Sequence, residues 1–169
     1  MLNALRRRAE TRRLSDGLAA ALIAQARLPV FYDTLGVADT IDGRFDLLAL
    51  HAWLVLDRLR EEGAESISQS LVDGLFVQFD EALRQQGAGD MGMGRRMTKM
   101  ADAFFGRLKA YREAGDHSAL AAALQRNVYR GDPASVDRAD ALAIYVAATR
   151  ENLSRQDLAA GEIDFGPGP

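Results

Sequence analysis

The sequence contains no cysteine, and His51 and His117 are its only histidines. The absence of cysteine excludes a disulfide, a thiol nucleophile and a thiolate metal site. Two histidines so far apart in the sequence also exclude a histidine-rich metal site, although a carboxylate site stays open. No Ser-His-Asp arrangement and no Glu-x-x-His spacing is present. We therefore expect no catalytic residues, no bound metal and no cofactor, and predict that the protein is not an enzyme.

Long apolar runs and alternating patterns are missing as well. No apolar run approaches the roughly 20 residues that a helix needs to cross a bilayer, and no secretory signal pattern is present. No stretch alternates apolar and polar residues as a half-buried strand requires. The apolar content of 48% and charged content of 27% are those of an ordinary globular protein. These features predict an all-α single domain, a bundle of six or seven helices.

The longest uninterrupted helical pattern covers residues 42–60, with Asp42 as its expected N-cap. One arc of this helix holds Phe45, Leu48, Ala49, Ala52, Val55, Leu56 and Leu59, and Leu47, Leu50 and Leu54 lie nearly opposite. A surface helix carries one apolar stripe, so a helix with two is packed on both sides. We expect this helix to be central. His51 is expected on a polar seam between Arg44 and Arg58, which would disfavour its protonation.

Capping patterns predict where the outer helices begin: at Ser15 or Asp16, at Ser66 with Gln69, at Asp116, and at Asp132 with Pro133. A further helix is expected from about Arg95 to Ala114, after the glycine-rich connector 87–94. We divide the chain into a flexible basic segment (1–13), a helical domain (14–153) and a C-terminal tail (154–169), of which residues 161–169 are expected to be loosely held.

The net charge of −3 is unevenly distributed. Residues 1–13 contain five arginines and one glutamate. Three interpretations of this segment compete: a frayed, solvated terminus, a basic helix lying on an anionic membrane, and an organelle transit peptide. The membrane interpretation assigns lipid contacts to Arg6, Arg7 and Arg8, as a peripheral contact that is secondary to the main function.

The glycine-rich connector contains a literal Gly-x-Gly-x-x-Gly at Gly87, Gly89 and Gly92. A dinucleotide-binding site requires a strand before these glycines, whereas the preceding segment has a helical pattern. A helix C-cap followed by turns explains the glycines without a nucleotide. A second hypothesis places Arg95 and Arg96 at a helix start after Gly94, where free N–H groups could bind a phosphate or carboxylate.

The stretch 95–112 carries six basic residues against Asp102 alone. A solvated helix face is one explanation, and an RNA- or ribosome-binding module is the alternative. Nucleic-acid binding would also require aromatic side chains that stack on bases, but Phe104 and Phe105 have the spacing of core residues. We expect no direct DNA binding.

Several stretches together resemble the ubiquinol–cytochrome c chaperone family, the assembly factors of the cytochrome bc1 complex. They are Asp39-Thr-x-Asp-Gly-Arg-Phe45 with Leu-x-x-Leu-His51, Gln69-Ser-Leu-x-Asp73, Gly87-x-Gly-Asp90, Gly94-x-Arg-Met97, Ala103-Phe-x-Gly-Arg107, Arg126-Asn-x-Tyr129 and Gly161-Glu-Ile-Asp-Phe165. The resemblance extends over residues 28–165. It implies a non-enzymatic protein that binds newly made cytochrome b and promotes assembly of the bc1 complex.

The resemblance also implies a location and further partners. A bacterial member would act in the cytoplasm, at the inner membrane, and a mitochondrial member on the matrix side, near the ribosome and with a small partner subunit. The family supplies no catalytic residues to transfer to this chain. Charge and position instead select the expected partner contacts: Arg95, Arg96, Lys99, Met93, Asp42 and Arg44.

Overall fold

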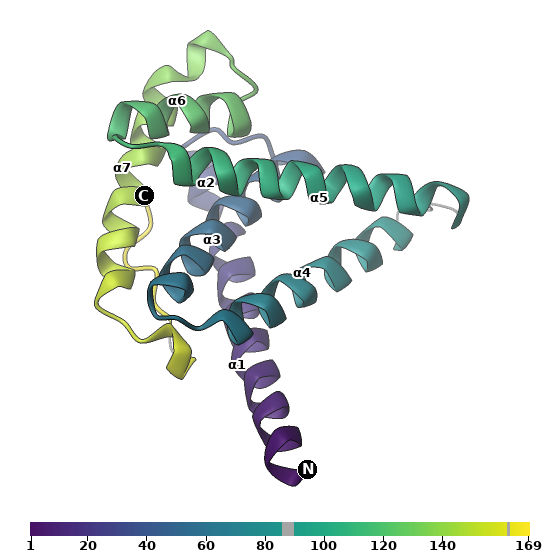
Figure 1. Cartoon of the computed structure of the whole chain (residues 1–169). Coiled ribbons are helices and arrows are strands. Elements are labelled where there is room, and N and C mark those ends of the chain that lie inside the picture. The colour runs from purple at the N-terminus through teal and green to yellow at the C-terminus, as the bar shows by residue number, and fades with distance from the viewer. Residues whose placement is uncertain (86–89, 162) are drawn as a thin grey trace.

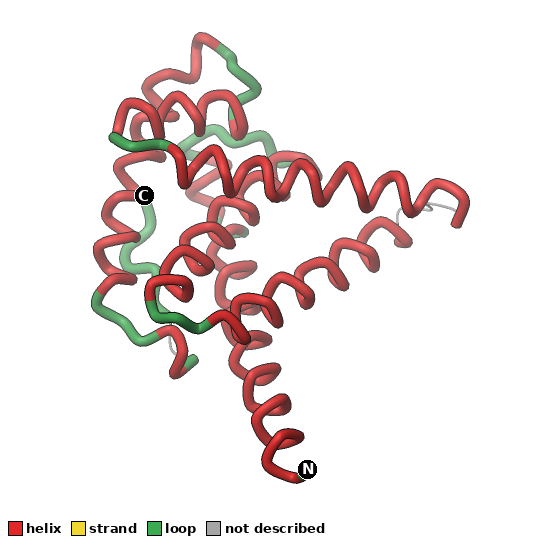
Figure 2. Tube along the Cα trace, viewed as in Figure 1, coloured by secondary structure: helices red, strands yellow, loops and turns green. Residues whose placement is uncertain are grey.

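The computed structural model describes residues 1–85, 90–161 and 163–169, and this part of the chain contains helices and loops but no strand (Figure 2). The α-helices are α1 (Leu2–Ala26), α2 (Pro29–Asp33), α3 (Ile41–Glu61), α4 (Glu65–Gln85), α5 (Asp90–Glu113), α6 (His117–Val128) and α7 (Val136–Ser154). Two 3₁₀ turns, η1 (Pro133–Ser135) and η2 (Leu158–Ala160), flank α7. The predicted all-α architecture is confirmed. No described helix is long and apolar enough to span a membrane.

Helix α3 lies at the centre, as its two apolar arcs predict (Figure 1). Both arcs are largely buried, with Leu47, Leu50 and Leu54 on one side and Val55 and Leu59 on the other, while Phe45 and Leu48 are partly buried. Helices α1, α4, α5, α6 and α7 all contact it. The chain therefore folds as a shell of helices around α3.

Several helix starts predicted from capping patterns are wrong. Helix α3 is capped by Thr40, whose hydroxyl accepts from the Gly43 N–H at 3.1 Å, while Asp42 lies in the first turn. Helix α1 begins at Leu2 and not at Ser15, which is buried inside the helix with its Oγ 2.7 Å from Ser70 Oγ. Helix α4 begins at Glu65, so Ser66 is inside the helix and no capping box forms. The predicted cap at Asp116 is confirmed. Asp132 caps the 3₁₀ turn η1, whereas α7 itself begins at Val136, so the predicted start of the last helix at Asp132 is wrong.

Helices α4 and α5 form a V whose arms approach each other at the end far from α6 and α7 (Figure 1). The chain between the arms includes Gly87 and Gly89 of the predicted connector, which lie outside the described residues. Helix α5 begins at Asp90, five residues before the expected start at Arg95. Gly94 and Arg95 are thus within the helix, and the predicted anion site on free N–H groups at Gly94 is wrong.

The chain after α7 folds back onto the core and is not loosely held. Leu158 and Phe165 are buried, and the Glu62 carboxylate accepts hydrogen bonds from the backbone N–H groups of Leu158 and Ala159, both at 3.0 Å. The division into a basic segment, a helical domain and a tail stays a prediction.

Candidate partner-binding site

A buried carboxylate on α3 holds α5 in place. Asp46 is fully buried, and its oxygens lie 2.7 Å from Arg107 Nε of α5 and 2.7 Å from Arg130 Nη2, which follows α6. Burial raises the pKa of Asp46 above its ordinary value, against the opposing effect of the two guanidinium groups. The Arg107 guanidinium also lies over the Phe45 ring, 5.1 Å from its centre. This arrangement fixes one side of α5 against the start of α3.

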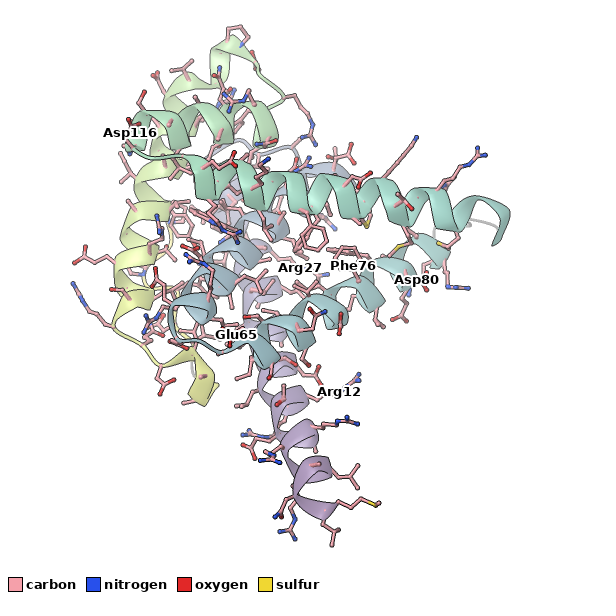
Figure 3. The ribbon with its side chains drawn as sticks, in the orientation of Figure 1. Arg12, Arg27, Glu65, Phe76, Asp80 and Asp116 are labelled. Atoms are coloured by element: carbon pink, nitrogen blue, oxygen red, sulfur yellow. The ribbon has the colours of Figure 1, made fainter. Side chains whose placement is uncertain are left out.

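Five phenylalanine rings fill the space between the arms of the V. Phe76 of α4 lies there (Figure 3), with ring centres 5.6 Å from Phe104 and 5.4 Å from Phe79. Phe79 in turn lies 5.6 Å from Phe45. Phe105 has core-like spacing in the sequence, but it is 49% exposed and stacks on Phe76 at the edge of the cluster. The rings leave an apolar surface on each side of the V.

On one side this surface is hollowed into a cleft of about 140 Å³. We call it the Ile41 cleft; its apolar lining includes Ile23, Ile41, Phe45, Leu48, Leu83 and Met100. Ile41 is 61% exposed at the start of α3, an unusual position for a large apolar side chain beside other apolar groups. The end of α1, the start of α3, the end of α4 and the middle of α5 each contribute, so the cleft exists only in the folded protein.

Two exposed arginines, Arg27 and Arg44, also line the Ile41 cleft. They are shared with a neighbouring hollow of about 390 Å³ whose other residues include Tyr32, Asp33 and Asp39. Arg44 Nε donates to Asp39 Oδ1 at 2.7 Å, and this hydrogen bond lowers the pKa of Asp39. No ion pair of Arg27 is formed within the described part of the chain. The cleft therefore combines an apolar floor with a positively charged edge.

The predicted partner contacts are only partly brought together. Arg95, Arg96 and Lys99 are exposed on α5 and form no ion pair among the described residues. By helical periodicity, Arg96 lies one turn before Met100 on the same side of α5, so this cation extends the edge of the Ile41 cleft. Arg44 lines the cleft itself.

Two predicted contacts and the predicted membrane contacts lie elsewhere. Met93 is only 6% exposed, so it is not a surface contact. Asp42 is exposed in the first turn of α3, next to Ile41. Arg6, Arg7 and Arg8 line a separate hollow between α1 and the start of α4.

Sequence reasoning did not find Arg27 and Ile41 as site residues. An apolar residue between the Thr40 cap and the polar first turn of α3 is the one signal that could have indicated Ile41. Arg27 follows α1 and belongs to the cleft only because the ends of α1 and α4 meet near the start of α3, a contact between distant segments that periodicity does not encode.

The expected environment of His51 is wrong. Its ring is fully buried, with Nδ1 2.7 Å from the Leu47 carbonyl oxygen and Nε2 2.9 Å from the Tyr145 hydroxyl. Arg58 instead pairs with Glu62, with Nε 3.0 Å from Oε1. Burial, and not a neighbouring arginine, lowers the pKa of His51 to about 4. No group of acidic or histidine side chains in the described ranges could hold a metal ion.

Comparisons with known proteins identify the class of protein to which this chain belongs. The family model for the ubiquinol-cytochrome C chaperone matches residues 33–162, most of the chain. The chain therefore belongs to the ubiquinol–cytochrome c chaperone family, a family of assembly factors for the bc1 complex.

Two individual proteins show how far the similarity extends. The crystal structure of the Cbp3 homolog from Brucella abortus is 34% identical in sequence, with a TM-score of 0.83 and coverage of 99% of both chains. Ubiquinol-cytochrome-c reductase complex assembly factor 1 of Xenopus laevis is 24% identical over 145 residues, covering 81% of this chain and 72% of that protein. The family resemblance in the sequence is thus confirmed.

Proposed function

We propose that this chain is an assembly chaperone that binds newly made cytochrome b and holds it for assembly into the bc1 complex. Membership of the family supports the general role, and the Ile41 cleft is the observation that carries the proposal. A chaperone for a membrane-protein subunit must cover apolar surface that its client later buries. The exposed Ile41 side chain beside an apolar hollow provides such a surface.

The size and charge of the Ile41 cleft define what the client presents. A cavity near 150 Å³ accepts a group about the size of a benzene ring, so the cleft of about 140 Å³ fits one large apolar side chain. Arg27, Arg44 and Arg96 at its edge favour an acidic side chain nearby on the same client segment. We infer that Arg95 and Lys99, exposed beside Arg96 on α5, attract the client by charge.

The proposal places the protein at the inner membrane, on the cytoplasmic side in a bacterium or the matrix side in a mitochondrion. A small partner subunit or the ribosome would then act at the same stage, when the client is new. The alternative function, an RNA- or ribosome-binding module on residues 95–112, is supported by the exposed Arg95, Arg96 and Lys99. It is weakened because Arg107 pairs with Asp46 and Lys109 Nζ lies 3.8 Å from Glu113 Oε1.

Site-specific photo-crosslinking in the native host tests the proposal. A photoreactive phenylalanine analogue replaces Ile41, and the captured proteins are identified by mass spectrometry. We expect cytochrome b to be captured at this position. The matched control replaces Ile144 of α7, which is 59% exposed but does not line the cleft, and it should capture little cytochrome b.

Other outcomes would decide against the proposal. Capture of ribosomal proteins without cytochrome b would favour the alternative function. Equal capture of cytochrome b at Ile41 and at Ile144 would still identify cytochrome b as the client, but it would reject the Ile41 cleft as the binding surface.

A further inference from the structure

The first half of α1 stands apart from the rest of the molecule. Residues 2–13, which we call the N-terminal arm, extend about 18 Å as a helix and project past the start of α4 (Figure 1). The family model matches residues 33–162, a range that does not include the arm. Its side chains are almost all exposed, including Leu2 at 74% and Leu5 at 59%.

The apolar residues of the arm form a face of their own. Leu2, Leu5 and Ala9 follow helical spacing and lie on one side of α1. The core face of the same helix is formed by its buried residues Ser15, Leu18, Ala19, Leu22 and Ala26. At 100° per residue, the middle of the arm's apolar face lies roughly 120° around the helix from the middle of this core face, with Leu5 at the near edge. The apolar face of the arm is therefore turned away from the core face, and Leu2 and Leu5 are exposed.

Contacts with α4 fix this orientation. The hydrogen bond between Ser15 and Ser70 turns one side of α1 toward α4. On that side the arm faces α4 across a hollow of about 820 Å³, which Ser66, Gln69 and Asp73 line with polar groups. The hollow gives Leu2 and Leu5 no apolar partner, and neither residue lines it. They remain available to an outside partner.

Arginines border the apolar face on both sides. By helical periodicity Arg6 and Arg13 lie along one border, and Arg12 lies along the other, in line with Leu5; Arg8 lies further around on this second side, toward α4. Arg12 is seen on the arm in Figure 3. Arg13 pairs with Glu10 at 3.2 Å and Arg12 with Asp16 at 3.8 Å. Within the described chain, Arg6, Arg7 and Arg8 form no ion pair. Exposed leucines between free cations fit the boundary between acyl chains and anionic headgroups.

We propose that the N-terminal arm binds the surface of an anionic membrane, with Leu2 and Leu5 inserted and Arg6 and Arg8 on the lipid headgroups. A nucleic acid would use the cations but not the leucines, and the outward apolar face favours lipid. Arg7 lies nearly opposite the apolar face and contributes least. Binding through the arm would hold the chaperone at the membrane where its membrane-protein client emerges, and it would not involve the Ile41 cleft.

Vesicle co-sedimentation of the full chain tests the proposal without any client, so its result is separate from that of the crosslinking experiment. We expect binding to vesicles that contain phosphatidylglycerol and none to phosphatidylcholine alone. Arg6→Gln/Arg8→Gln should weaken the binding about 30-fold, and Leu2→Ser/Leu5→Ser about tenfold or more. The matched control Arg95→Gln/Arg96→Gln removes the same charge from α5 and should bind as the parent chain does.

Three results would overturn the proposal. The first is the absence of binding to anionic vesicles at low salt. The second is unchanged binding of the leucine variant together with displacement by an RNA oligonucleotide, which would make the arm a general polyanion binder. The third is an equal loss in the α5 control, which would show that net charge and not the arm is responsible. Far-UV circular dichroism confirms that each variant is folded.

Discussion

Two hydrogen bonds at the centre of the molecule determine which nitrogen of His51 carries its proton. The Leu47 carbonyl can only accept, so Nδ1 donates to it at 2.7 Å, and Nε2 accepts from the Tyr145 hydroxyl at 2.9 Å. The Tyr145 oxygen in turn accepts from Gln25 Nε2 at 3.0 Å. The neutral ring therefore forms a hydrogen bond with each of its two polar neighbours, whereas protonation would place an unpaired charge in the core.

Protonation of His51 predicts a loss of stability in mild acid. The pKa is lowered from 6.5 to about 4 in the folded state. Between these values the unfolded chain binds the proton and the folded chain does not, so stability is full above pH 6.5 and decreases as the pH falls. The free energy of unfolding of the parent chain should fall between pH 7.5 and pH 5, and in His51→Gln this fall should be about 2 kcal/mol smaller, as measured by urea denaturation.

The other histidine provides the control. His117 lies at the surface, with Nε2 2.6 Å from Asp140 Oδ1, so His117→Gln leaves the buried ring of His51 and its hydrogen bonds intact and is the matched substitution. A pH dependence that is the same in His51→Gln and the parent chain would contradict the assignment.

At the start of α3, the space around Gly43 explains why a glycine is needed in the stretch Asp39–Phe45. Gly43 donates to the Thr40 cap, and a Cβ at this position would lie 1.9 Å from the Ala38 carbonyl oxygen. The backbone of 37–38 therefore has to move away from the helix start if any side chain is added, and Ile41 would move with it.

Gly43→Ala is accordingly expected to destabilise the fold by about 1–3 kcal/mol, measured by thermal or urea denaturation. Gly106→Ala in α5 is the matched control, because no atom lies within 4 Å of its added Cβ. That substitution should raise stability by up to about 1 kcal/mol through helix propensity. Equal effects of the two substitutions would refute the steric explanation.

Local patterns predicted the elements of this fold better than their ends. The packing of α3 on two sides could be predicted, because a helix that is buried on two sides must carry apolar residues on both. Ser15 has the composition of a cap, yet its partner Ser70 is in α4, and no local pattern shows that contact. The same limit applies to the site: Arg44 and Arg96 were selected by charge, whereas the apolar cleft between them needs four separate segments to meet.

At the scale of the whole molecule, α3 carries two buried carboxylates that neutralise arginines from the outer helices. Asp46 forms ion pairs with Arg107 and Arg130. Asp57 forms ion pairs with Arg150 of α7 at 3.1 Å and with Arg112 of α5 at 3.9 Å. The basic stretch 95–112 is thus divided. Its second half holds α5 onto α3, and its first half is free at the surface. Composition alone presented it as one patch.

This division predicts two different phenotypes from one helix. Arg107→Gln leaves the Asp46 carboxylate without one of its two partners and should cost about 3 kcal/mol of stability or more. Arg95→Gln/Arg96→Gln/Lys99→Gln removes only exposed charge and should change stability by less than about 0.5 kcal/mol. If α5 receives the client, the triple variant should nevertheless lower the ubiquinol–cytochrome c reductase activity of host membranes, with the chaperone itself present at normal level. Normal reductase activity in the triple variant would show that these three residues do not contribute to client binding. An unfolded triple variant would show that the division along α5 is wrong.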